Sequence, residues 1–447
     1  MRVVPLALRR DPLDVLASLA AEPHAFLLEV PRIGTTLLGC APPAELRVLA
    51  DGRVVREGSR GSDAEPLAAI ERFVAEAPCH VPFPFGTVVG YLAYELGRFT
   101  EPPRDGAWRA PDVPLAVLAR YDPVLAYRRG QYELVSVDPA RGRPRWLERL
   151  GTPVSGAAEP FASGPLIADV PRNDYLAAAT RILDYIAAGD VYQVNLTLPF
   201  SAPLAAPAWR LFASLARRHP APHAAYLDVG DAQLVSASPE LFLRRSGDRL
   251  ETRPIKGTRP RGPTRARDGA LVAELRGDAK ERAEHVMIVD LERNDLGRVA
   301  ATGSVAVEDY ARVESHPSVH HLVSSVVGRA RPGVGLADLL RATFPGGSIT
   351  GAPKVRAMEI IRELEAWPRG AYTGAFGVFH SGGDVELALA IRTAVVRDGR
   401  VRYHAGGGIV ADSDPERELA EAWLKTAALR LALGDDGALA LERCSSG

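Results

Sequence analysis

The sequence predicts a large protein of mixed α and β structure, and three observations support this prediction. The chain has 447 residues, which suffices for two or three average domains or for one large α/β unit. Hydrophobic residues make up 47% and charged residues 24%, the balance of an ordinary globular protein with a sizeable core. Short apolar runs separated by turn residues fill the first third of the chain, whereas helical and strand patterns alternate in the rest.

Residues 1–150 are expected to form mainly β-structure, with residues 64–77 as the best helical segment. Turn residues separate the expected strands, which are residues 25–30, 53–57, 86–96, 114–127 and 132–137. No group of catalytic residue types stands out there, so we interpret this region as scaffold. Small residues and prolines without periodicity follow, and residues 151–170 are therefore expected to be a linker.

Residues 171–433 are expected to form the functional region, followed by a tail of residues 434–447. Residues that can cap a helix precede three of the predicted helices, namely Asn173 or Asp174, Asp278 and Asp414. The predicted helices cover residues 175–188, 208–218, 279–292, 355–365 and a segment that begins at Pro415. Residues 294–297 are expected to form a turn, and the predicted strands are residues 191–198, 224–229, 232–237, 375–380, 385–396 and 401–404.

Charge and cysteine content exclude several classes of protein. The formal net charge is -1, so no overall field attracts nucleic acid or an anionic membrane. Cys40, Cys79 and Cys444 lie far apart and form neither a disulfide framework nor a zinc pattern, which is typical of a reducing compartment. No secretory signal or membrane span is recognisable. We therefore expect a cytoplasmic protein with no nucleic-acid or membrane partner.

Lys256 is the first candidate catalytic residue. The chain contains only four lysines among 54 basic residues, and a lysine, unlike an arginine, can become a neutral nucleophile near neutral pH. Arg253, Arg259 and Arg261 flank it and would favour the neutral amine if their charges approach it. Glu240 follows a predicted strand upstream, so the two residues form a candidate pair of acid and nucleophile. Each residue alone is more often a solvated surface group.

Acidic residues on two predicted helices are candidate metal ligands. Glu284 lies on a stripe of the helix at residues 279–292, for which an exposed, salt-bridged face is the simpler interpretation. Glu418, Glu421 and Lys425 share one stripe of the last helix, which is also compatible with a solvated surface. If the two acidic stripes face each other, their oxygens suit a hard cation such as Mg²⁺.

Two glycine-rich segments are notable, and the first of them invites comparison with a phosphate-binding loop. In residues 346–354 the lysine follows Ala-Pro and no Ser or Thr comes after it, so we interpret the segment as a close-approach loop before a helix. Residues 406–408 are successive glycines whose N–H groups can approach an anion. His320 and His321 open a predicted strand without further soft ligands, which excludes a zinc site there.

From about residue 173 to residue 433, a series of ordered blocks resembles the family of chorismate-utilising enzymes. The blocks are VYQVNLT, ASPELFLR, RPIKGTRPRG, ERAEHVMIVDLERNDLGRV, HHLVSSVVG, FPGGSITGAPKVRAMEII, RGAYTGAFGVF, AIRTA and GGGIVADSDPERELAEAWLK. FLLEV, GYLAYELGR and PLAVLARYDPVLAY resemble the family's N-terminal region more loosely. The resemblance implies an α/β unit in which two large, mostly antiparallel β-sheets pack as a sandwich with flanking helices.

Within the family, the resemblance is to the members that aminate chorismate at C4. The block PIKGT around Lys256 is similar to aminodeoxychorismate synthases, whereas anthranilate synthases carry PIAGT, and Gln193 stands where isochorismate-forming members place a lysine. The implied product is 4-amino-4-deoxychorismate, a precursor of p-aminobenzoate and folate. Ammonia would come from a separate glutaminase subunit. An anthranilate synthase is the alternative, and a non-catalytic regulatory binding protein is an alternative of another class.

The resemblance also implies roles for the candidate residues. Glu284 and Glu421, with Glu418 close by, would hold Mg²⁺, which would bind the ring carboxylate of chorismate. Glu240 would protonate the departing C4 hydroxyl group, and Lys256 would attack C2 to form a covalent intermediate that ammonia resolves at C4.

Further positions match the family's substrate contacts. They are Gln193, Thr258, His321, Ser348, Tyr372, Arg392, Gly408 and Lys425. Arg392 and the Gly408 amide would receive the enolpyruvyl carboxylate, and Lys425 would add positive charge near the ring carboxylate.

Overall fold

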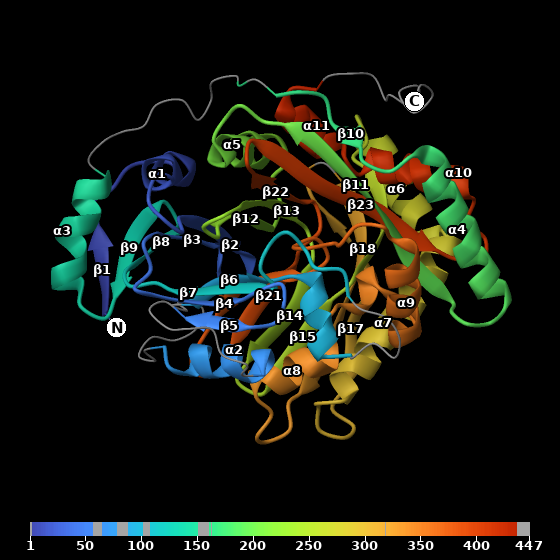
Figure 1. The fold of residues 1–447 in the computed structure, drawn as a ribbon, viewed down its shortest axis with the longest axis horizontal. Coiled ribbons are helices and arrows are strands. Elements are labelled where there is room, and N and C mark those ends of the chain that lie inside the picture. The colour runs from blue at the N-terminus through green and yellow to red at the C-terminus, as the bar shows by residue number, and fades with distance from the viewer. Residues whose placement is uncertain are drawn as a thin grey trace.

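A computed structural model describes residues 2–56, 65–77, 88–101, 108–150, 161, 163–317 and 319–435, with the side chains of residues 141–145 set aside. Most of the predicted linker and of the predicted tail lies outside these residues. Two large antiparallel β-sheets form the centre of the molecule, and helices cover the outside (Figure 1). This architecture confirms the expected fold class.

The first sheet has twelve strands among the described residues. Their spatial order is β1 (Arg2–Leu6), β9 (Gln131–Ser136), β8 (Val124–Arg128), β3 (Thr35–Gly39), β2 (Phe26–Val30), β12 (His223–Asp228), β13 (Gln233–Ser238), β22 (Thr393–Arg397), β23 (Arg400–Ile409), β11 (Gln193–Pro203) and β10 (Ile167–Ala168), and β19 (Gly351–Ala352) also pairs with β11.

The second sheet has eleven strands among the described residues. Their spatial order is β16 (Ile255–Pro260), β18 (Val319–Arg329), β15 (Arg249–Arg253), β14 (Leu241–Ser246), β21 (Val385–Leu389), β20 (Ala375–Phe379), β6 (Val88–Leu92), β7 (Ala116–Arg120), β4 (Ala44–Val48) and β5 (Val54–Arg56), and β17 (Ala306–Ser315) also pairs with β18.

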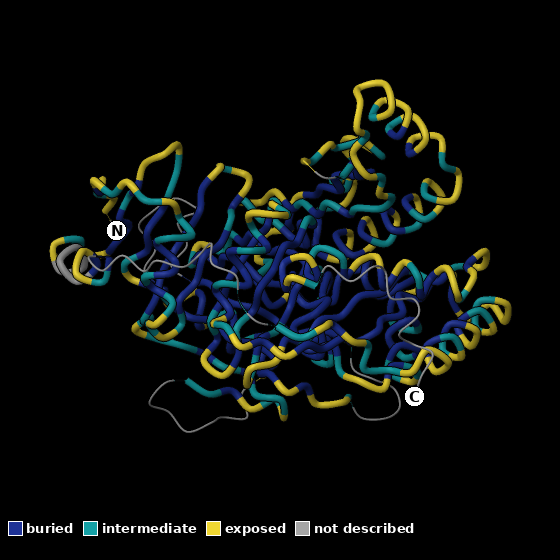
Figure 2. Tube along the Cα trace, turned by 90° about the horizontal axis from the view of Figure 1, so that it is seen from above, coloured by how far each residue is buried: buried dark blue, intermediate teal, exposed yellow. Residues whose placement is uncertain are grey.

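Apolar side chains from the two sheets pack against each other in a shared core. Its members include Phe26, Leu28 and Leu37 of the first sheet and Tyr91, Val117 and Phe376 of the second. Full burial of one such side chain contributes about 1.5–3 kcal/mol to folding. The central strands are accordingly buried, and exposed residues gather in the outer helices and turns (Figure 2).

Helices lie along the outer surfaces of the sheets. They are α1 (Pro12–Leu19), α2 (Pro66–Ala75), α3 (Pro139–Leu150), α4 (Arg172–Ala187), α5 (Ala208–Arg218), α6 (Arg265–Gly277), α7 (Ala279–Gly297), α8 (Leu336–Thr343), α9 (Lys354–Leu364), α10 (Pro415–Leu424) and α11 (Ala427–Leu433). Helix α4 contacts β11 and β23 of the first sheet and α10 contacts β23, whereas α7 contacts β16 and β18 of the second. No helix among the described residues is both long and apolar enough to cross a membrane.

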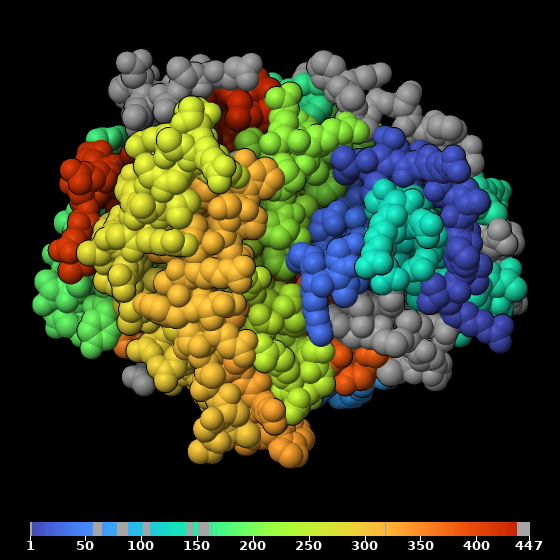
Figure 3. Space-filling view, turned by 180° about the vertical axis from the view of Figure 1, so that it is seen from behind, coloured from blue at the N-terminus to red at the C-terminus, as the bar shows by residue number. Residues whose placement is uncertain are grey.

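Strands from the N-terminal and C-terminal regions share both sheets. In the first sheet β2 pairs with β12, and in the second β6 pairs with β20. The N-terminal segments therefore lie directly beside the middle of the chain on the surface (blue beside green in Figure 3). The two predicted sequence regions contribute to one pair of sheets, so the N-terminal region acts as scaffold for the strands of the later region.

Several predicted elements match the structure, and the mismatches have physical reasons. Helix α5 and strands β12 and β13 are confirmed to within one residue. The predicted turn at residues 294–297 is wrong, because α7 continues to Gly297 and its residues Asp295 and Leu296 are buried. The predicted cap of α4 is also wrong, since Pro171 occupies the N-cap position. Helices α1 and α3 escaped prediction because strand patterns dominate the first region.

Candidate active site

Ser348 connects the two predicted catalytic residues. Its hydroxyl group donates a hydrogen bond of 2.8 Å to Oε1 of Glu240. Its carbonyl oxygen accepts a long hydrogen bond of 3.4 Å from Nζ of Lys256. The candidate acid and the candidate nucleophile thus meet at one residue that lies 92 positions after Lys256 in the chain.

Three backbone segments create this meeting point. Glu240 lies between β13 and β14, where its carbonyl oxygen accepts a hydrogen bond from the backbone N–H of Leu389. Lys256 lies in β16, and Ser348 lies in a single 3₁₀ turn, η3 (Gly347–Ile349). Gly351 has a φ of 145°, and a Cβ there would lie 2.1 Å from the carbonyl oxygen of Gln193. Only glycine allows this approach, so the predicted close-approach loop is confirmed.

The environment of Glu240 suits proton transfer. Burial raises its pKa to about 7, although the hydrogen bond from Ser348 and the positive charge of Lys256 oppose this rise. The side chain has an exposed fraction of 6%, so little solvent competes with these contacts. A carboxyl group with a pKa near 7 can hold and release a proton at neutral pH.

The arginines near Lys256 in the sequence form ion pairs with carboxylates. The ion pairs are Arg253 with Glu314 at 2.5 Å, Arg259 with Asp278 at 2.7 Å and Arg261 with Asp268 at 2.9 Å. These pairs offset the charges that were expected to act on Lys256. Lys256 interacts instead with carboxylates. Its positive charge lowers the pKa of Glu240 and of Glu421, whereas burial raises both.

Two acidic helices face each other beside this centre. Glu284 on α7 and Glu418 on α10 both lie 3.9 Å from Nζ of Lys280, which therefore bridges the two helices. Asp414 caps α10 as predicted, by accepting a hydrogen bond from the N–H of Arg417. Burial raises the pKa of Glu284 and of Glu418, since desolvation outweighs the attraction of the nearby lysines.

The third candidate ligand, Glu421, has its own counter-ion. Nζ of Lys425 lies 2.7 Å from Glu421 and donates a hydrogen bond of 2.6 Å to the carbonyl oxygen of Gly406. Burial alone would raise the pKa of Glu421, but its attraction to Lys425, with smaller contributions from Lys280 and Lys256, lowers it. Lys425 itself is the C-cap residue of α10 and links that helix to β23.

The donor set on α7 and α10 fits a hard divalent cation. Glu284, Glu418 and Glu421 offer only carboxylate oxygens, the ligands that Mg²⁺ prefers. Among the described residues no three potential ligands lie close enough together to hold a metal ion by themselves. Such a cation would therefore need oxygens from a bound molecule to complete its shell, and it would compete with the ammonium group of Lys280.

Three of the predicted substrate contacts, Thr258, His321 and Tyr372, have partners in the structure. Thr258 Oγ1 and Nδ1 of His321 lie 3.0 Å apart in a hydrogen bond, and Tyr372 stacks on the ring of His404. Burial, together with the positive charge of Arg392, lowers the pKa of His321 to about 4. His321 is therefore a neutral hydrogen-bonding group at neutral pH.

Arg392 lies where the chain passes from one sheet to the other. The predicted strand at residues 385–396 is in fact two strands, β21 in the second sheet and β22 in the first. Arg392 between them has a φ of 49°, a left-handed conformation that costs a residue with a side chain about 1–3 kcal/mol. Its guanidinium group forms no ion pair with the described residues, which leaves its charge for a ligand.

Gln193 and Gly408 lie against each other on neighbouring strands. A Cβ on Gly408 would lie 2.5 Å from Nε2 of Gln193, so the carboxamide covers this glycine. Neither polar atom of the fully buried Gln193 side chain has a hydrogen-bond partner among the described residues. The three successive glycines are part of strand β23 and pair with Thr197, Leu196 and Asn195 of β11.

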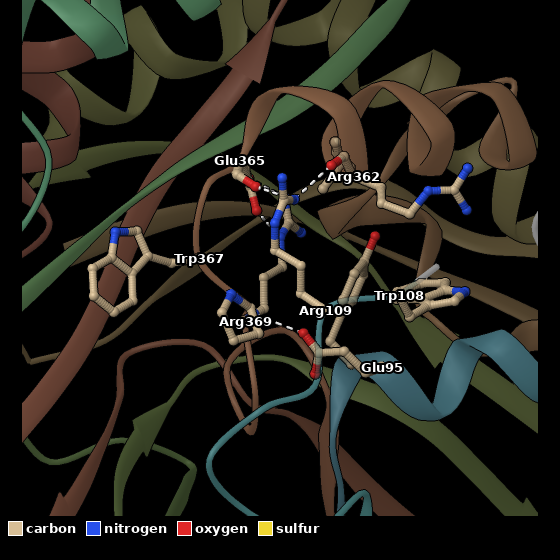
Figure 4. A pocket seen from close by; sticks show the side chains of 10 residues that line it. Glu95, Trp108, Arg109, Arg362, Glu365, Trp367 and Arg369 are labelled. Atoms are coloured by element: carbon tan, nitrogen blue, oxygen red, sulfur yellow. Dashed lines mark hydrogen bonds and ion pairs between the residues drawn. The ribbon is translucent and has the colours of Figure 1, made fainter. Parts of the chain in front are cut away.

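A pocket outside the predicted site contains buried charges (Figure 4). Arg369 pairs with Glu365 at 2.7 Å, and it also donates hydrogen bonds to the carbonyl oxygens of Asn195 and Ile349. The pair therefore joins the end of α9 to β11 and to the loop that carries Ser348. None of the predicted site residues lines this pocket.

The scarcity of lysine could have identified two further residues near the site. All four lysines lie beside carboxylates of this region: Lys256 near Glu240, Lys280 near Glu284 and Glu418, Lys354 near Asp295, and Lys425 near Glu421. Lys280 and Lys354 were not assigned to the site from the sequence. Their rarity among 54 basic residues was the available indication.

Comparison with known proteins decides the family. The family model described as chorismate binding enzyme matches residues 23–430. The chain belongs to this family. It is 43% identical over 425 residues to anthranilate synthase component 1 of Thermus thermophilus, with 91% of each chain covered. It is 36% identical over 430 residues to aminodeoxychorismate synthase component 1 of Bacillus subtilis, with 92% of each chain covered.

A solved member of the chorismate-binding family has the same fold. The crystal structure of anthranilate synthase component I from Streptococcus pneumoniae superposes with a TM-score of 0.80 at 29% identity, over 89% of this chain and 92% of that one. The chain is therefore a chorismate-utilising enzyme. Relatives that carry different names match it over nearly their whole length, so overall identity does not distinguish between their reactions.

Proposed function

We propose that this enzyme is the synthase component of an aminodeoxychorismate synthase, which uses chorismate and ammonia to form 4-amino-4-deoxychorismate. The observation that carries the proposal is the contact of Glu240 and Lys256 with the same residue, Ser348. Alanine at position 256, as in the anthranilate-type block PIAGT, would leave the site without an amine at this point. An amine and a proton donor held side by side suit a substitution that needs both.

The proposed reaction has two balanced steps. The neutral amine of Lys256 adds to C2 of the ring, the two ring double bonds shift, and the C4–O bond breaks as Glu240 transfers its proton to the departing hydroxyl group, which leaves as water. Ammonia then adds to C4, the double bonds return, and the C2–N bond to Lys256 breaks. The resulting amine is 4-amino-4-deoxychorismate, and proton transfer back to Glu240 restores the enzyme.

The remaining residues bind the two carboxylates of chorismate. Arg392 has no competing ion pair among the described residues and would receive the enolpyruvyl carboxylate together with the amide of Gly408. Gln193 offers a donor and an acceptor next to Gly408 that have no partner within the described part of the chain. Thr258, His321 and Tyr372 complete the substrate contacts in this proposal.

Mg²⁺ is the proposed cofactor. Glu284 and Glu421 would hold it, with Glu418 nearby, and the bound cation would neutralise the ring carboxylate of chorismate. Lys425 would add a second positive charge there. A separate glutaminase subunit is the proposed source of ammonia in the cell.

Product analysis tests the proposal. The purified chain is incubated with chorismate, MgCl₂ and ammonium at slightly alkaline pH, and the products are separated by chromatography and identified by mass. Formation of 4-amino-4-deoxychorismate supports the proposal. Formation of anthranilate would show an anthranilate synthase instead, and no consumption of chorismate would favour a regulatory binding protein.

A further inference from the structure

A buried ionisable cluster lies directly behind the Ser348 loop. Glu292 and Asp295 come from α7, and Lys354 begins α9. Nζ of Lys354 lies 2.5 Å from Oδ2 of Asp295 and donates a second hydrogen bond to the carbonyl oxygen of Thr343. All three ionisable side chains are at most 7% exposed. Asp295 and Lys354 form an ion pair with each other, whereas Glu292 accepts hydrogen bonds from outside the cluster.

Glu292 holds the two segments that carry the catalytic contact. Its Oε1 accepts a hydrogen bond of 3.2 Å from the N–H of Gly347, the residue before Ser348. Its Oε2 lies 3.2 Å from Oγ1 of Thr252, in the strand β15 that leads into Lys256. One carboxyl group thus spans the backbone of the Ser348 loop and the strand before the lysine.

Close packing makes this connection stiff. A Cβ on Gly347 would lie 2.7 Å from Cδ2 of Leu291 and 3.1 Å from Oε1 of Glu292, so α7 presses directly on the loop at this glycine. This contact leaves the loop little room to move toward α7, and the hydrogen bond from the Gly347 N–H to Glu292 holds the loop against that helix.

We propose that Glu292 is a positioning residue that sets the geometry between Ser348, Glu240 and Lys256 through its hydrogen bonds to Gly347 and Thr252. This inference rests on the proposed role of Glu240 and Lys256 in catalysis, and it adds a residue that touches neither the substrate nor these two side chains.

The charge state of Glu292 is compatible with this role. Burial and the neighbouring charge of Asp295 raise its pKa to about 8, while Lys354 acts in the opposite direction. A neutral carboxyl group at neutral pH still has oxygens that accept hydrogen bonds from the Gly347 N–H and from the Thr252 hydroxyl group. A glutamine has the same shape, keeps an acceptor for the Gly347 N–H and places its amide against the Thr252 oxygen, which can accept from it, so it serves as the conservative replacement.

Three variants test the inference. Glu292→Leu removes both hydrogen bonds, Glu292→Gln keeps them, and Glu386→Leu is the matched control. Glu386 is another glutamate that is 4% exposed, and it accepts a hydrogen bond from Arg244 in β14 without touching the Ser348 loop. The melting temperature, the KM for chorismate and the kcat are measured for each variant, with the rate taken as chorismate consumption at saturating Mg²⁺ and ammonium.

The expected pattern separates positioning from simple stability. Glu292→Leu is expected to lower kcat at least about tenfold, equivalent to about 1.4 kcal/mol in the barrier, with KM within about twofold of wild type. Glu292→Gln is expected to keep kcat within about threefold, and Glu386→Leu to lower the melting temperature while keeping kcat.

Several results would overturn the inference. A Glu292→Leu enzyme that melts earlier but keeps its kcat would show a purely structural role, and a Glu292→Gln enzyme as slow as Glu292→Leu would show that the contacts are not what matters. If Glu292→Leu does not fold, Thr252→Val removes one of the two contacts, and an unchanged kcat in that variant would also contradict the inference. Chorismate consumption is independent of which product forms, so these outcomes are distinct from a failure of the proposed function.

Discussion

Glu240 and Lys256 meet at Ser348, which donates a hydrogen bond to the carboxylate and accepts one from the amine. This relationship brings the proposed proton donor and the proposed nucleophile into contact with the same small residue. It also makes the proton affinity of Glu240 depend on its neighbour, because the Ser348 hydrogen bond and the charge of Lys256 both lower a pKa that burial raises to about 7.

The pH dependence of turnover tests the role of Glu240 as an acid. Glu240 must carry a proton to act, so kcat is expected to fall as the pH rises through about 7. Ser348→Ala removes a hydrogen bond that lowers the pKa, so the fall should move to higher pH. The measurement is kcat at constant free ammonia, with Ser236→Ala as a buried serine control. A wild-type kcat that stays level or rises between about pH 6 and pH 8 contradicts this role.

Arg392 is expected to bind a substrate carboxylate. Arg392→Gln should raise the KM for chorismate about 10-fold to 100-fold, since a hydrogen bond to a charged group contributes about 1.5–3 kcal/mol. Arg400→Gln is the control and should leave KM unchanged, because Arg400 lies at the start of β23 and donates a hydrogen bond to Ser201. Steady-state kinetics with chorismate as the varied substrate measures both. An unchanged KM in Arg392→Gln would remove this residue from the site.

Gln193 is expected to lower the stability of the free protein and to contribute to chorismate binding. Its carboxamide is buried without a partner among the described residues, so Gln193→Met should raise the melting temperature in the absence of ligand. The same change should raise the KM for chorismate, because the donor and acceptor next to Gly408 are lost. Thermal unfolding and kinetics are measured on the same preparation. A variant that melts lower and binds chorismate normally would assign Gln193 a purely structural role.

Lys280 is expected to compete with the divalent cation. Its ammonium group lies 3.9 Å from both Glu284 and Glu418, so Lys280→Met should tighten Mg²⁺ binding about fivefold or more by removing an attraction of about 1 kcal/mol. Calorimetric titration with MgCl₂ in the absence of chorismate measures this, with Arg276→Met on α6 as the control. Weaker Mg²⁺ binding in Lys280→Met would show that the lysine supports the site.

Much of the fold was predictable from local patterns, because short-range signals decide it. Helix α5 and the hairpin of β12 and β13 follow from apolar periodicity and turn residues. The ordered sequence blocks predicted the paired sheets through family resemblance. The break at Arg392 was not predictable, since residues 385–396 are mostly apolar with strand-like composition and the interruption of the strand comes from its switch between the two sheets.

The candidate site was predictable in its residue types and less so in its connections. The rarity of lysine identified Lys256, but its contact with Ser348 depends on a loop far along the chain. The network of Glu292, Asp295 and Lys354 was hidden because residues 294–297 were expected to form a turn. The burial of Asp295 within α7 is a tertiary effect that no local pattern encodes.

The most direct test of the account is the rate and adduct analysis of Lys256→Ala beside wild type. Each enzyme is mixed with chorismate and Mg²⁺ without ammonium, quenched, and examined by peptide mass spectrometry, and each is assayed with ammonium for product. The account predicts an adduct of chorismate less one water on the wild-type peptide that contains Lys256, and loss of aminodeoxychorismate formation in the variant. A variant that still forms aminodeoxychorismate at the wild-type rate, with no adduct in wild type, would contradict it.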